Sequence, residues 1–363
     1  MKGSLDKYVS LVVIVSPSAE VVSGSLLRPI NIYYSLKGFK IDHVPVRKTP
    51  SLLLQLSRIL RAGVIIVSGV NPWISASIAT LGRVLRKEVL TDFHGFSWLE
   101  ASLTNAVGPF MRRLLLVSEK ISYKLSRYVV VASQWLAKVL NHYFGERRSV
   151  VVLENAVPCI FEEITHKLMK SYDLNMLRRY VCERVLHRND CFDKLLFIAP
   201  LPSVFKSNIL AYRELLKLRL LLENVMIIVT GIKRTDVFDF QGNIIPIGYV
   251  SYVDYVALLL SSDGIILPYP SNAICGGIRN KVLEAGFCAK PVVSTKTGMM
   301  HLNAVPNFHY VLIDDKEAPW ISRKDLLKEV SEKLGFLVKE NYSFKVFREK
   351  WTRLIALILQ GRR

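Results

Sequence analysis

Short apolar runs alternate with helix-forming stretches along the whole chain, and this alternation limits the possible folds more than any other feature. In the first half, strands are expected at residues 9–15, 64–67, 89–90, 128–131 and 150–153, and helices at 26–37, 52–61, 74–85, 110–126 and 134–143. Strands that alternate with helices are typical of parallel sheets with helices on both faces. The first half therefore predicts a doubly wound α/β domain.

The same alternation begins again in the second half. Strands are expected there at residues 195–199, 226–230, 244–247, 264–267 and 291–294, and helices at 209–222, 252–260 and 281–288. A polar, helix-prone stretch at 161–193 separates the halves, and a helix at 344–359 closes the chain. Because 363 residues are many for a single core, we expect two Rossmann-like domains, one after the other.

Two apolar segments raise the question of a membrane anchor. The first, at residues 9–15, is too short to span a bilayer and is interpreted as a buried strand, not as a signal peptide. The second, an uncharged run at 64–82, is long enough, but a Ser-Gly pair and an Asn-Pro pair interrupt it. A strand, a turn and a helix explain this run better than a transmembrane helix does.

The charge balance restricts the class of partner. The chain carries 49 Lys and Arg against 30 Asp and Glu, a net charge of +19, which favours nucleic acid, an anionic membrane surface or phosphorylated substrates as partners. No aromatic-basic RNA motif, zinc-finger spacing or basic heptad region is present, which argues against nucleic acid. Five cysteines without a C-x-x-C pair argue against a secreted disulfide scaffold and favour a reducing, cytoplasmic location.

The stretch "CGGIRNKVLEAGFCAKPVVST", residues 275–295, suggests a phosphate site. A glycine pair before a helix leaves backbone N–H groups uncovered at the helix N-terminus, where the helix dipole favours an anion. Lys281 and Glu284 are three residues apart and share one helix face, as a phosphate contact and a ribose contact would. The alternative is a surface Lys-Glu pair after an ordinary Gly-rich turn.

Taken with its surroundings, this stretch resembles the retaining glycosyltransferases of family 4, of the archaeal type, which have the glycosyltransferase B (GT-B) fold. "GGIRNKVLEAGFCAKPVVSTKTG" is similar to the family's Gly-x-x-x-Lys-x-x-Glu-Ala segment and the Lys-Pro-Val-Val that follows it. "DYVALLLSSDGIILPYPS", "VVLENAVPCIFE", "FIAPLPSVFKSN", "DFHGFSWLE" and "ASQWLAKVL" resemble further family segments in the same order. The resemblance covers nearly the whole chain.

The resemblance implies a domain organisation. An N-terminal acceptor-binding domain is expected at residues 1–158, and a C-terminal domain that binds the nucleotide-sugar donor at 159–340. A C-terminal helix, at 341–363, is expected to cross back toward the N-terminal domain, and the active site to lie in the interdomain cleft.

The sequence departs from the family pattern at two places. The family often carries two glutamates eight residues apart, and the second falls on Glu284, but Gly276 occupies the first position. The donor-sugar preference therefore cannot be carried over. A Gly-Arg of the family is replaced by Ala199-Pro200, and Arg279 is a candidate to supply the missing charge.

The resemblance assigns roles to residues of the second domain. Lys206, Arg279, Lys281 and the amides of Gly276 and Gly277 are candidates to stabilise the departing diphosphate. Glu284 would accept hydrogen bonds from ribose, and the backbone at Tyr249 and Val250 would read the edge of the base. For each cation the alternative is a solvated surface charge.

In the first domain, His94 follows "DF" and precedes Gly95, where the resemblance implies contact with the donor sugar or the attacking centre. Gly24 and Arg28 lie in "SGSLLRPIN", which resembles a glycine loop near the acceptor or the donor phosphate. A structural histidine, a helix cap and a surface arginine are the respective alternatives.

The sequence thus predicts a cytoplasmic retaining glycosyltransferase that moves a hexose from a UDP- or GDP-linked donor to a glycan or lipid-linked acceptor. No metal and no separate cofactor are expected, because no Asp-x-Asp occurs and "CERVLHRNDC" lacks a fourth zinc ligand. The alternatives are a nucleotide-sugar epimerase of the same fold and a non-catalytic nucleotide-sugar-binding subunit. The donor base, the sugar and the acceptor are left open.

Residues 110–128, "FMRRLLLVSEKISYKLSRY", place five cations among apolar and aromatic residues. We expect this helix to rest on anionic lipid at the inner face of the membrane. The alternative is a helix packed on the core with a solvated basic face.

Overall fold

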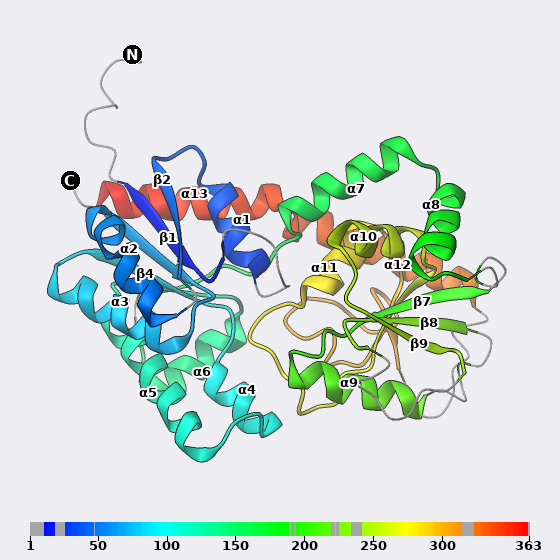
Figure 1. Ribbon diagram of the computed structural model, residues 1–363, viewed down its shortest axis with the longest axis horizontal. Coiled ribbons are helices and arrows are strands. Elements are labelled where there is room, and N and C mark those ends of the chain that lie inside the picture. The colour runs from blue at the N-terminus through cyan, green and yellow to red at the C-terminus, as the bar shows by residue number, and fades with distance from the viewer. Residues whose placement is uncertain are drawn as a thin grey trace, which may run out of the picture. The chain divides into compact units, whose positions relative to one another are not determined.

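The computed structural model of the protein describes residues 11–18, 26–46, 48–147, 149–188, 191, 194–218, 222, 225–233, 242–313 and 323–361. The chain forms two six-stranded sheets in which all the pairs are parallel, with helices beside each sheet (Figure 1). This confirms the predicted α/β class with two doubly wound halves.

The chain divides into two compact units. Unit 1 comprises Met1–Pro158, Cys275–Ile278 and Phe344–Arg363, and unit 2 comprises Cys159–Ile274 and Arg279–Ser343. The chain thus passes from one unit to the other at Pro158 and at Ser343, and the short segment Cys275–Ile278 joins unit 1. Nothing in the sequence predicts that this segment belongs to unit 1.

The sheet of unit 1 has the strand order β2-β1-β3-β4-β5-β6. Its elements are β1 (Val12–Ser16), α1 (Leu27–Ser35), β2 (Ile41–Pro45), α2 (Thr49–Arg61), β3 (Val64–Ser68), α3 (Pro72–Val84), β4 (Glu88–Phe93), α4 (Ser97–Thr104), α5 (Pro109–Leu125), β5 (Tyr128–Val131), α6 (Gln134–Phe144), β6 (Val150–Val152) and α13 (Phe344–Gln360).

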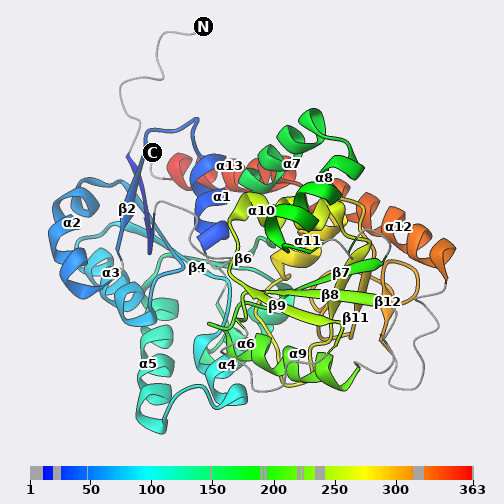
Figure 2. The same ribbon diagram turned by 45° about the vertical axis from the view of Figure 1, so that its right-hand side comes forward.

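Successive side chains of a strand point to opposite faces of the sheet, so a strand buried on both faces is apolar throughout. In β1, Val12 and Ile14 pack in one core with helices α1 and α13, while Val13 and Val15 pack in another with α2 and α3. The C-terminal helix α13 therefore covers the first sheet, beside α1 (Figures 1 and 2).

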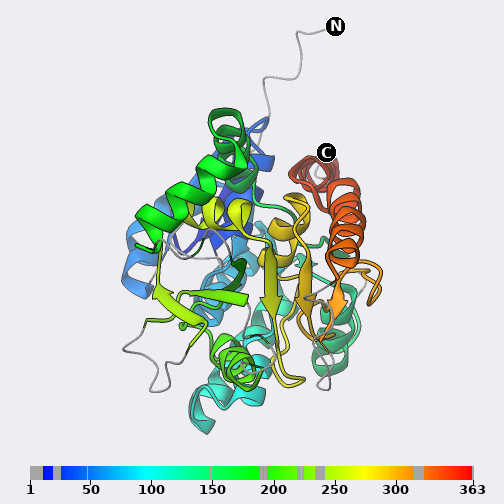
Figure 3. The same ribbon diagram turned by 90° about the vertical axis from the view of Figure 1, so that its right-hand side faces the viewer.

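The sheet of unit 2 has the strand order β12-β11-β10-β7-β8-β9. Its elements are α7 (Cys159–Ser171), α8 (Leu174–Tyr180), the π-helix η2 (Val181–Val185), β7 (Leu195–Pro200), α9 (Lys206–Lys217), β8 (Val225–Thr230), β9 (Ile244–Gly248), α10 (Tyr252–Ser261), β10 (Gly264–Leu267), α11 (Asn280–Phe287), β11 (Val292–Ser294), β12 (Val311–Leu312) and α12 (Lys324–Tyr342). Figure 3 shows the green helix α9 on one side of these strands and the yellow helix α11 on the other.

Four elements were not predicted from the sequence: β2, β12, α4 and α12. Strand β2, "IDHVP", lies at the edge of its sheet, and most of its side chains are only half-buried. An edge strand of this kind needs no apolar run, so its sequence resembles a loop. Helix α4 has no fully buried residue among its eight positions, and its Trp98 and Leu99 are only partly buried against the core.

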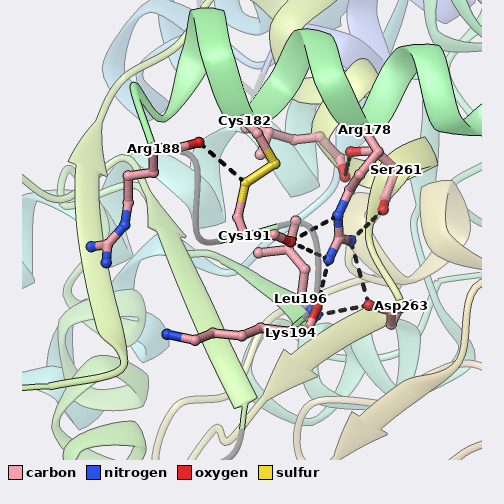
Figure 4. Close-up of a disulfide and its surroundings, with 9 residues drawn as sticks. Arg178, Cys182, Arg188, Cys191, Lys194, Leu196, Ser261 and Asp263 are labelled. Atoms are coloured by element: carbon pink, nitrogen blue, oxygen red, sulfur yellow. Dashed lines mark hydrogen bonds and ion pairs between the residues drawn. A yellow bond between two sulfur atoms is a disulfide. The ribbon is translucent and has the colours of Figure 1, made fainter.

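A disulfide in unit 2 joins Cys182 of η2 to Cys191 (Figure 4). Beside it, Arg178 of α8 donates to the carbonyl oxygens of Cys191, Lys194 and Ser261 at 2.8, 2.6 and 2.7 Å. The sequence predicted no disulfide scaffold, and this pairing was not expected. Its partners are only nine residues apart in the chain, with Cα atoms 6.1 Å apart.

Within the described residues, no helix is both long and apolar enough to cross a membrane. Nor do these residues include a group of three or more His, Cys, Asp or Glu that could hold a metal ion.

Replacing Trp351 of α13 with alanine is expected to lower the free energy of unfolding by about 3–5 kcal/mol, because it leaves a large cavity against the first sheet. Trp351 is fully buried beside Phe347 and Ile355. Its Nε1–H has no hydrogen-bond partner in the described structure. Trp351→Phe removes that buried donor along with some volume, so its loss should be much smaller. Denaturant unfolding of both variants checks this, and equal losses would contradict it.

Candidate functional site

Arg28 of α1 lies at the carboxyl edge of the unit 1 sheet and is 4% exposed. Its guanidinium holds the Asp92 carboxylate of β4 in a two-pronged ion pair, with Nη2–Oδ1 at 2.7 Å and Nε–Oδ2 at 2.9 Å. It also donates to Asn155 Oδ1 and to the carbonyl of Leu153, while the Ser68 hydroxyl donates to Asp92. Arg28 thus ties together the ends of β3, β4 and β6. Its predicted phosphate contact stays a prediction, and Gly24 lies outside the described residues.

His94 follows β4 directly, next to this ion pair. Burial lowers the pKa of His94 most; the nearby Asp92 raises it and Arg28 lowers it further. The imidazole is therefore neutral near neutral pH. Its Nδ1 atom is covered from solvent and has no hydrogen-bond partner in the described part of the chain. A covered nitrogen without a partner is available to a ligand hydroxyl.

Gly276 and Gly277 lie in the part of unit 1 that the segment Cys275–Ile278 supplies. The carbonyl of Gly276 accepts a hydrogen bond from Ser133 Oγ at 2.6 Å, and that of Ile278 accepts one from Asn155 Nδ2 at 2.7 Å. A Cβ atom on Gly276 would come within 2.5 Å of the Gly95 Cα atom and within 2.9 Å of the His94 carbonyl oxygen. Only glycine fits there, which gives a steric reason why no glutamate occupies this position.

Lys281 of α11 is not a free cation. Its Nζ donates to the Tyr269 hydroxyl at 2.7 Å, to the Pro200 carbonyl, and more weakly to Asn208 Oδ1 at 3.4 Å. Burial lowers the pKa of Lys281, and the neighbouring Arg279 adds to this effect. Because all three N–H groups have partners, Lys281 joins the ends of β7 and β10 to α11.

Of the cations predicted for the site in unit 2, Arg279 and Lys206 have donors to spare. The Arg279 guanidinium stacks on the Tyr269 ring, with Cζ at 3.6 Å from the ring centroid, and Nη2 donates to the Ala273 carbonyl at 2.5 Å. Its Nε is covered and has no partner within the described residues. Lys206 is exposed and opens α9, while Arg279 caps the start of α11. Both therefore stand at helix N-termini that follow parallel strands, where anions bind.

Glu284 of α11 is 3% exposed, and two tyrosines of α10 hold its carboxylate. The Tyr252 hydroxyl donates to Oε1 at 3.0 Å and the Tyr255 hydroxyl to Oε2 at 2.7 Å. Burial raises the pKa of Glu284, while the two tyrosine hydrogen bonds and Lys281 lower it. Each oxygen already has one donor, and a carboxylate oxygen can accept a second. Whether ribose supplies it stays a prediction.

Tyr249 and Val250 form the turn between β9 and α10. Tyr249 is 54% exposed, and Val250 is half-buried. Gly248 precedes them in a left-handed conformation, φ 76°; it donates to the Ile232 carbonyl at 2.8 Å and accepts from the Gly231 amide at 2.6 Å. The ends of β8 and β9 are thereby joined at the carboxyl edge of the unit 2 sheet, with the Tyr249 side chain open to solvent.

Several residues that build these two edges were not singled out in the sequence: Asp92, Asn208, Tyr252, Tyr255 and Tyr269. Glu119 of α5 is another. Its carboxylate accepts from the amides of Ser97 at 2.7 Å and Trp98 at 3.1 Å, so it caps α4 just after the His94 loop. Burial raises the pKa of Glu119 to about 7, although the two amides lower it. No sequence signal could pair a helix end with a carboxylate 22 residues away.

Glu119 predicts a pH dependence of stability. Its folded pKa of about 7 exceeds the ordinary 4.5. As pH rises between these values, the unfolded chain releases this proton before the folded chain does, so the free energy of unfolding falls, by up to about 3 kcal/mol. Glu119→Gln should lack that fall. Denaturant unfolding of both proteins across this range checks the difference, and parallel pH profiles would contradict it.

No protein-family model matches the chain, and no curated protein matches its sequence. Solved structures do match. Anabaena HepE in complex with UDP-glucose is 12% identical at TM-score 0.65, over 96% of this chain and 99% of that one. Sucrose-phosphate synthase of Thermosynechococcus elongatus is 12% identical at TM-score 0.68, over 97% and 100%. A glycosyltransferase of Rickettsia africae is 17% identical at TM-score 0.65, over 96% and 98%. This likeness shows that the chain has the glycosyltransferase B fold.

Proposed function

We propose that the protein is a retaining glycosyltransferase of the family 4 type, which moves a hexose from a nucleoside-diphosphate sugar to a hydroxyl acceptor. The observation that carries the proposal is Arg279, whose Nε is covered and has no partner in the described structure, at the carboxyl edge of the unit 2 sheet. A covered guanidinium N–H is costly unless a ligand completes it. A similar fold is solved with UDP-glucose and with UDP, which supports a diphosphate as that ligand.

Unit 2 would bind the donor, a UDP- or GDP-linked hexose. Arg279 and Lys206 would contact the diphosphate, together with uncovered amides at the starts of α11 and α9. These groups are in place before the reaction, so they stabilise the charge that develops on the diphosphate as the sugar leaves. The turn at Tyr249 and Val250 would contact the base, and Glu284 the ribose.

Unit 1 would supply the acceptor side, with His94 in contact with the sugar or the attacking hydroxyl. In a retaining transfer without a carboxylate nucleophile, the acceptor oxygen bonds to the anomeric carbon as the bond to the diphosphate oxygen breaks. The acceptor proton passes to that departing oxygen on the same face. A neutral His94 Nδ1 can accept or donate one hydrogen bond to hold a hydroxyl there.

A transfer assay tests the proposal. A thermal shift with each nucleotide first selects the donor, since a ligand of the folded state stabilises it. The full chain is then incubated with UDP-, GDP- and ADP-linked hexoses and with glycan or lipid-linked glycan acceptors. Product in large molar excess over the protein is the expected result. Nucleotide binding without such turnover would overturn the proposed transfer.

A second function, a non-catalytic nucleotide-sugar-binding subunit, is favoured by one observation. Gly276 stands where the family often has a carboxylate that contacts the donor sugar, and the close approach of Gly95 leaves no room for a side chain. The same assay decides, because a binding subunit gains thermal stability with the nucleotide but forms no product. An epimerase would instead convert the sugar nucleotide without any acceptor.

We propose that the protein contacts anionic lipid through the exposed stripe of α5. Phe110, Leu114 and Val117 lie on one face of this helix and are 81%, 38% and 47% exposed. Arg113 and Lys120, also exposed, share this face at helical spacing. Exposed apolar side chains among cations fit the surface of an anionic bilayer, and this supports a lipid-linked acceptor.

The double change Phe110→Ser and Leu114→Ser is expected to weaken binding to anionic vesicles about tenfold or more, because two apolar side chains no longer enter the interface. Flotation with vesicles at low salt measures it. Phe336→Ser with Leu357→Ser is the matched control, since these side chains are 71% and 57% exposed on other helices. If the parent protein does not float, or if both pairs act alike, α5 is only a solvated helix.

A further inference from the structure

A pocket of about 420 Å³ lies at the amino edge of the unit 1 sheet, where α3 leads into β4 and α5 leads into β5. It is lined by Gly82, Arg83, Arg86, Lys87, Leu125 and Arg127. Helices α3 and α5 pack against each other along this part of the unit (Figure 2). The six residues of β4 separate the pocket from His94, which at about 3.3 Å per residue is roughly 20 Å. The pocket is thus a different place from the candidate functional site.

The charges that line the pocket are mostly unneutralised. Arg83 and Arg86 are exposed and have no ion pair or hydrogen bond within the described residues, and Lys87 Nζ donates only to the Ala62 carbonyl, at 3.2 Å. Arg127 Nε lies 3.2 Å from Glu88 Oε2, but the Arg127 side chain is 62% exposed. Four cations therefore line the pocket, and Glu88 is the carboxylate that pairs with one of them.

The simplest alternative is that these cations only neutralise the partial negative charges at the C-termini of two helices. The C-termini of α3 and α5 both face this edge, and each carries a partial charge of about −0.5. Together with Glu88 they offset about two of the four positive charges, which leaves about two. Another cation, Arg147, donates to the carbonyls of Tyr123, Ser126 and Arg127 beside the pocket and adds to the excess. Helix capping thus does not account for the whole cluster.

We propose that this basic pocket binds an anion that carries two or more phosphate groups. Arginine offers a planar set of N–H donors that matches phosphate oxygens, and three arginines meet here around a volume in the range of small-ligand sites. The excess charge calls for more than one phosphate. The proposal does not depend on glycosyl transfer, because no residue of the pocket belongs to the candidate functional site.

Two sources can supply this chemistry: a soluble polyphosphate and a phosphorylated lipid headgroup. Val84 and Leu85 lie between Arg83 and Arg86 in the chain and are 72% and 43% exposed, so apolar side chains for a lipid chain are present next to two of the lining residues. Phe110 and Leu114, the two α5 residues changed in the vesicle test, lie 15 and 11 residues before Leu125 of the pocket, about 23 and 17 Å along the helix. The two surfaces can be changed separately.

Calorimetry of the full chain with inorganic tripolyphosphate, at low and at physiological salt, tests the site. Arg83→Gln with Arg86→Gln is expected to weaken tripolyphosphate binding about tenfold or more, as the loss of charge-assisted hydrogen bonds implies. The affinity for nucleoside diphosphate should not change. With the donor site filled by nucleoside diphosphate, Arg279→Ala should leave tripolyphosphate binding unchanged, although it weakens nucleoside-diphosphate binding, which separates this pocket from the donor site. Lys345→Gln with Arg348→Gln removes the same charge from exposed positions of α13 and controls for net charge.

Vesicles that contain diacylglycerol pyrophosphate, a lipid with two phosphate groups, are compared with vesicles of equal charge made with phosphatidylserine to distinguish the two sources. Preference for the pyrophosphate lipid that the Arg83 and Arg86 changes abolish assigns a lipid headgroup, while tripolyphosphate binding without that preference assigns a soluble anion. The proposal is overturned if the double variant binds tripolyphosphate as tightly as the parent does, or as tightly as the α13 control does. Arg83→Gln alone, at the exposed end of α3, serves if the double variant does not fold.

Discussion

Alanine at Arg279 or at Lys206 is expected to lower kcat by about a hundredfold, as removal of one preorganised donor to a developing charge does. The two residues differ in how they are held. Arg279 stacks on Tyr269 and keeps its covered Nε for a ligand, whereas Lys206 is exposed at the start of α9. Because both would act on charge that grows as the bond breaks, kcat should fall more than donor affinity. Initial rates at saturating donor measure the effect.

Two variants control for this result. Lys217 lies at the far end of α9 and pairs with Glu214 on the surface, so Lys217→Ala should leave kcat unchanged. Lys281→Ala should differ from both, because it removes the hydrogen-bonded Nζ that joins β7, β10 and α11. We expect it to lower thermal stability together with any loss of rate. If Arg279→Ala and Lys206→Ala both keep the parent kcat, the leaving group is stabilised elsewhere and the assignment fails.

The buried strands could be predicted because burial on both faces favours a nearly continuous apolar run; in β4 only residues 89–90 were predicted, since Glu88, Thr91 and Asp92 are buried there as well. Strands β5 and β10 begin and end at the residues the apolar runs indicate, Tyr128–Val131 and Gly264–Leu267. Strand β2 could not be predicted in this way, since an edge strand is free to carry Asp42 and His43. Periodicity thus reports burial and fails for β2, whereas α12 was missed although its buried residues Leu327, Val330 and Leu334 recur at helical spacing.

The candidate site, too, could be predicted only in part. Spacing correctly places Lys281 and Glu284 on one helix, α11, after a strand. It cannot show that Tyr269 and Pro200 bind the Lys281 amine, or that Tyr252 and Tyr255 bind the Glu284 carboxylate, because these partners come from other elements. Local pattern therefore locates a functional helix, while the state of each charge on it depends on contacts between distant segments.

Glu284→Gln is expected to weaken nucleoside-diphosphate binding about tenfold or more, with a smaller change in kcat. The neutral amide no longer offers a charged acceptor to two ribose hydroxyls, and such hydrogen bonds are worth about 1.5–3 kcal/mol. Ribose is bound alike before and during the reaction, so the loss belongs to affinity. Because burial raises the pKa of Glu284, the parent's affinity should fall as pH drops and the carboxylate takes up a proton, whereas the affinity of the Gln variant should stay level. Calorimetry with UDP and GDP at several pH values measures both effects.

The tyrosines separate this role from a purely structural one. Tyr252→Phe and Tyr255→Phe each remove one donor to the carboxylate while leaving its charge, so each should lower the free energy of unfolding by about 1–3 kcal/mol. Neither variant removes the acceptor that ribose needs, and nucleotide affinity should change much less than in Glu284→Gln. If Glu284→Gln binds nucleotide as tightly as the parent and loses as much stability as the tyrosine variants, the role of Glu284 is only to hold α11 against α10. The ribose of the donor would then bind at another place on the carboxyl edge of the unit 2 sheet.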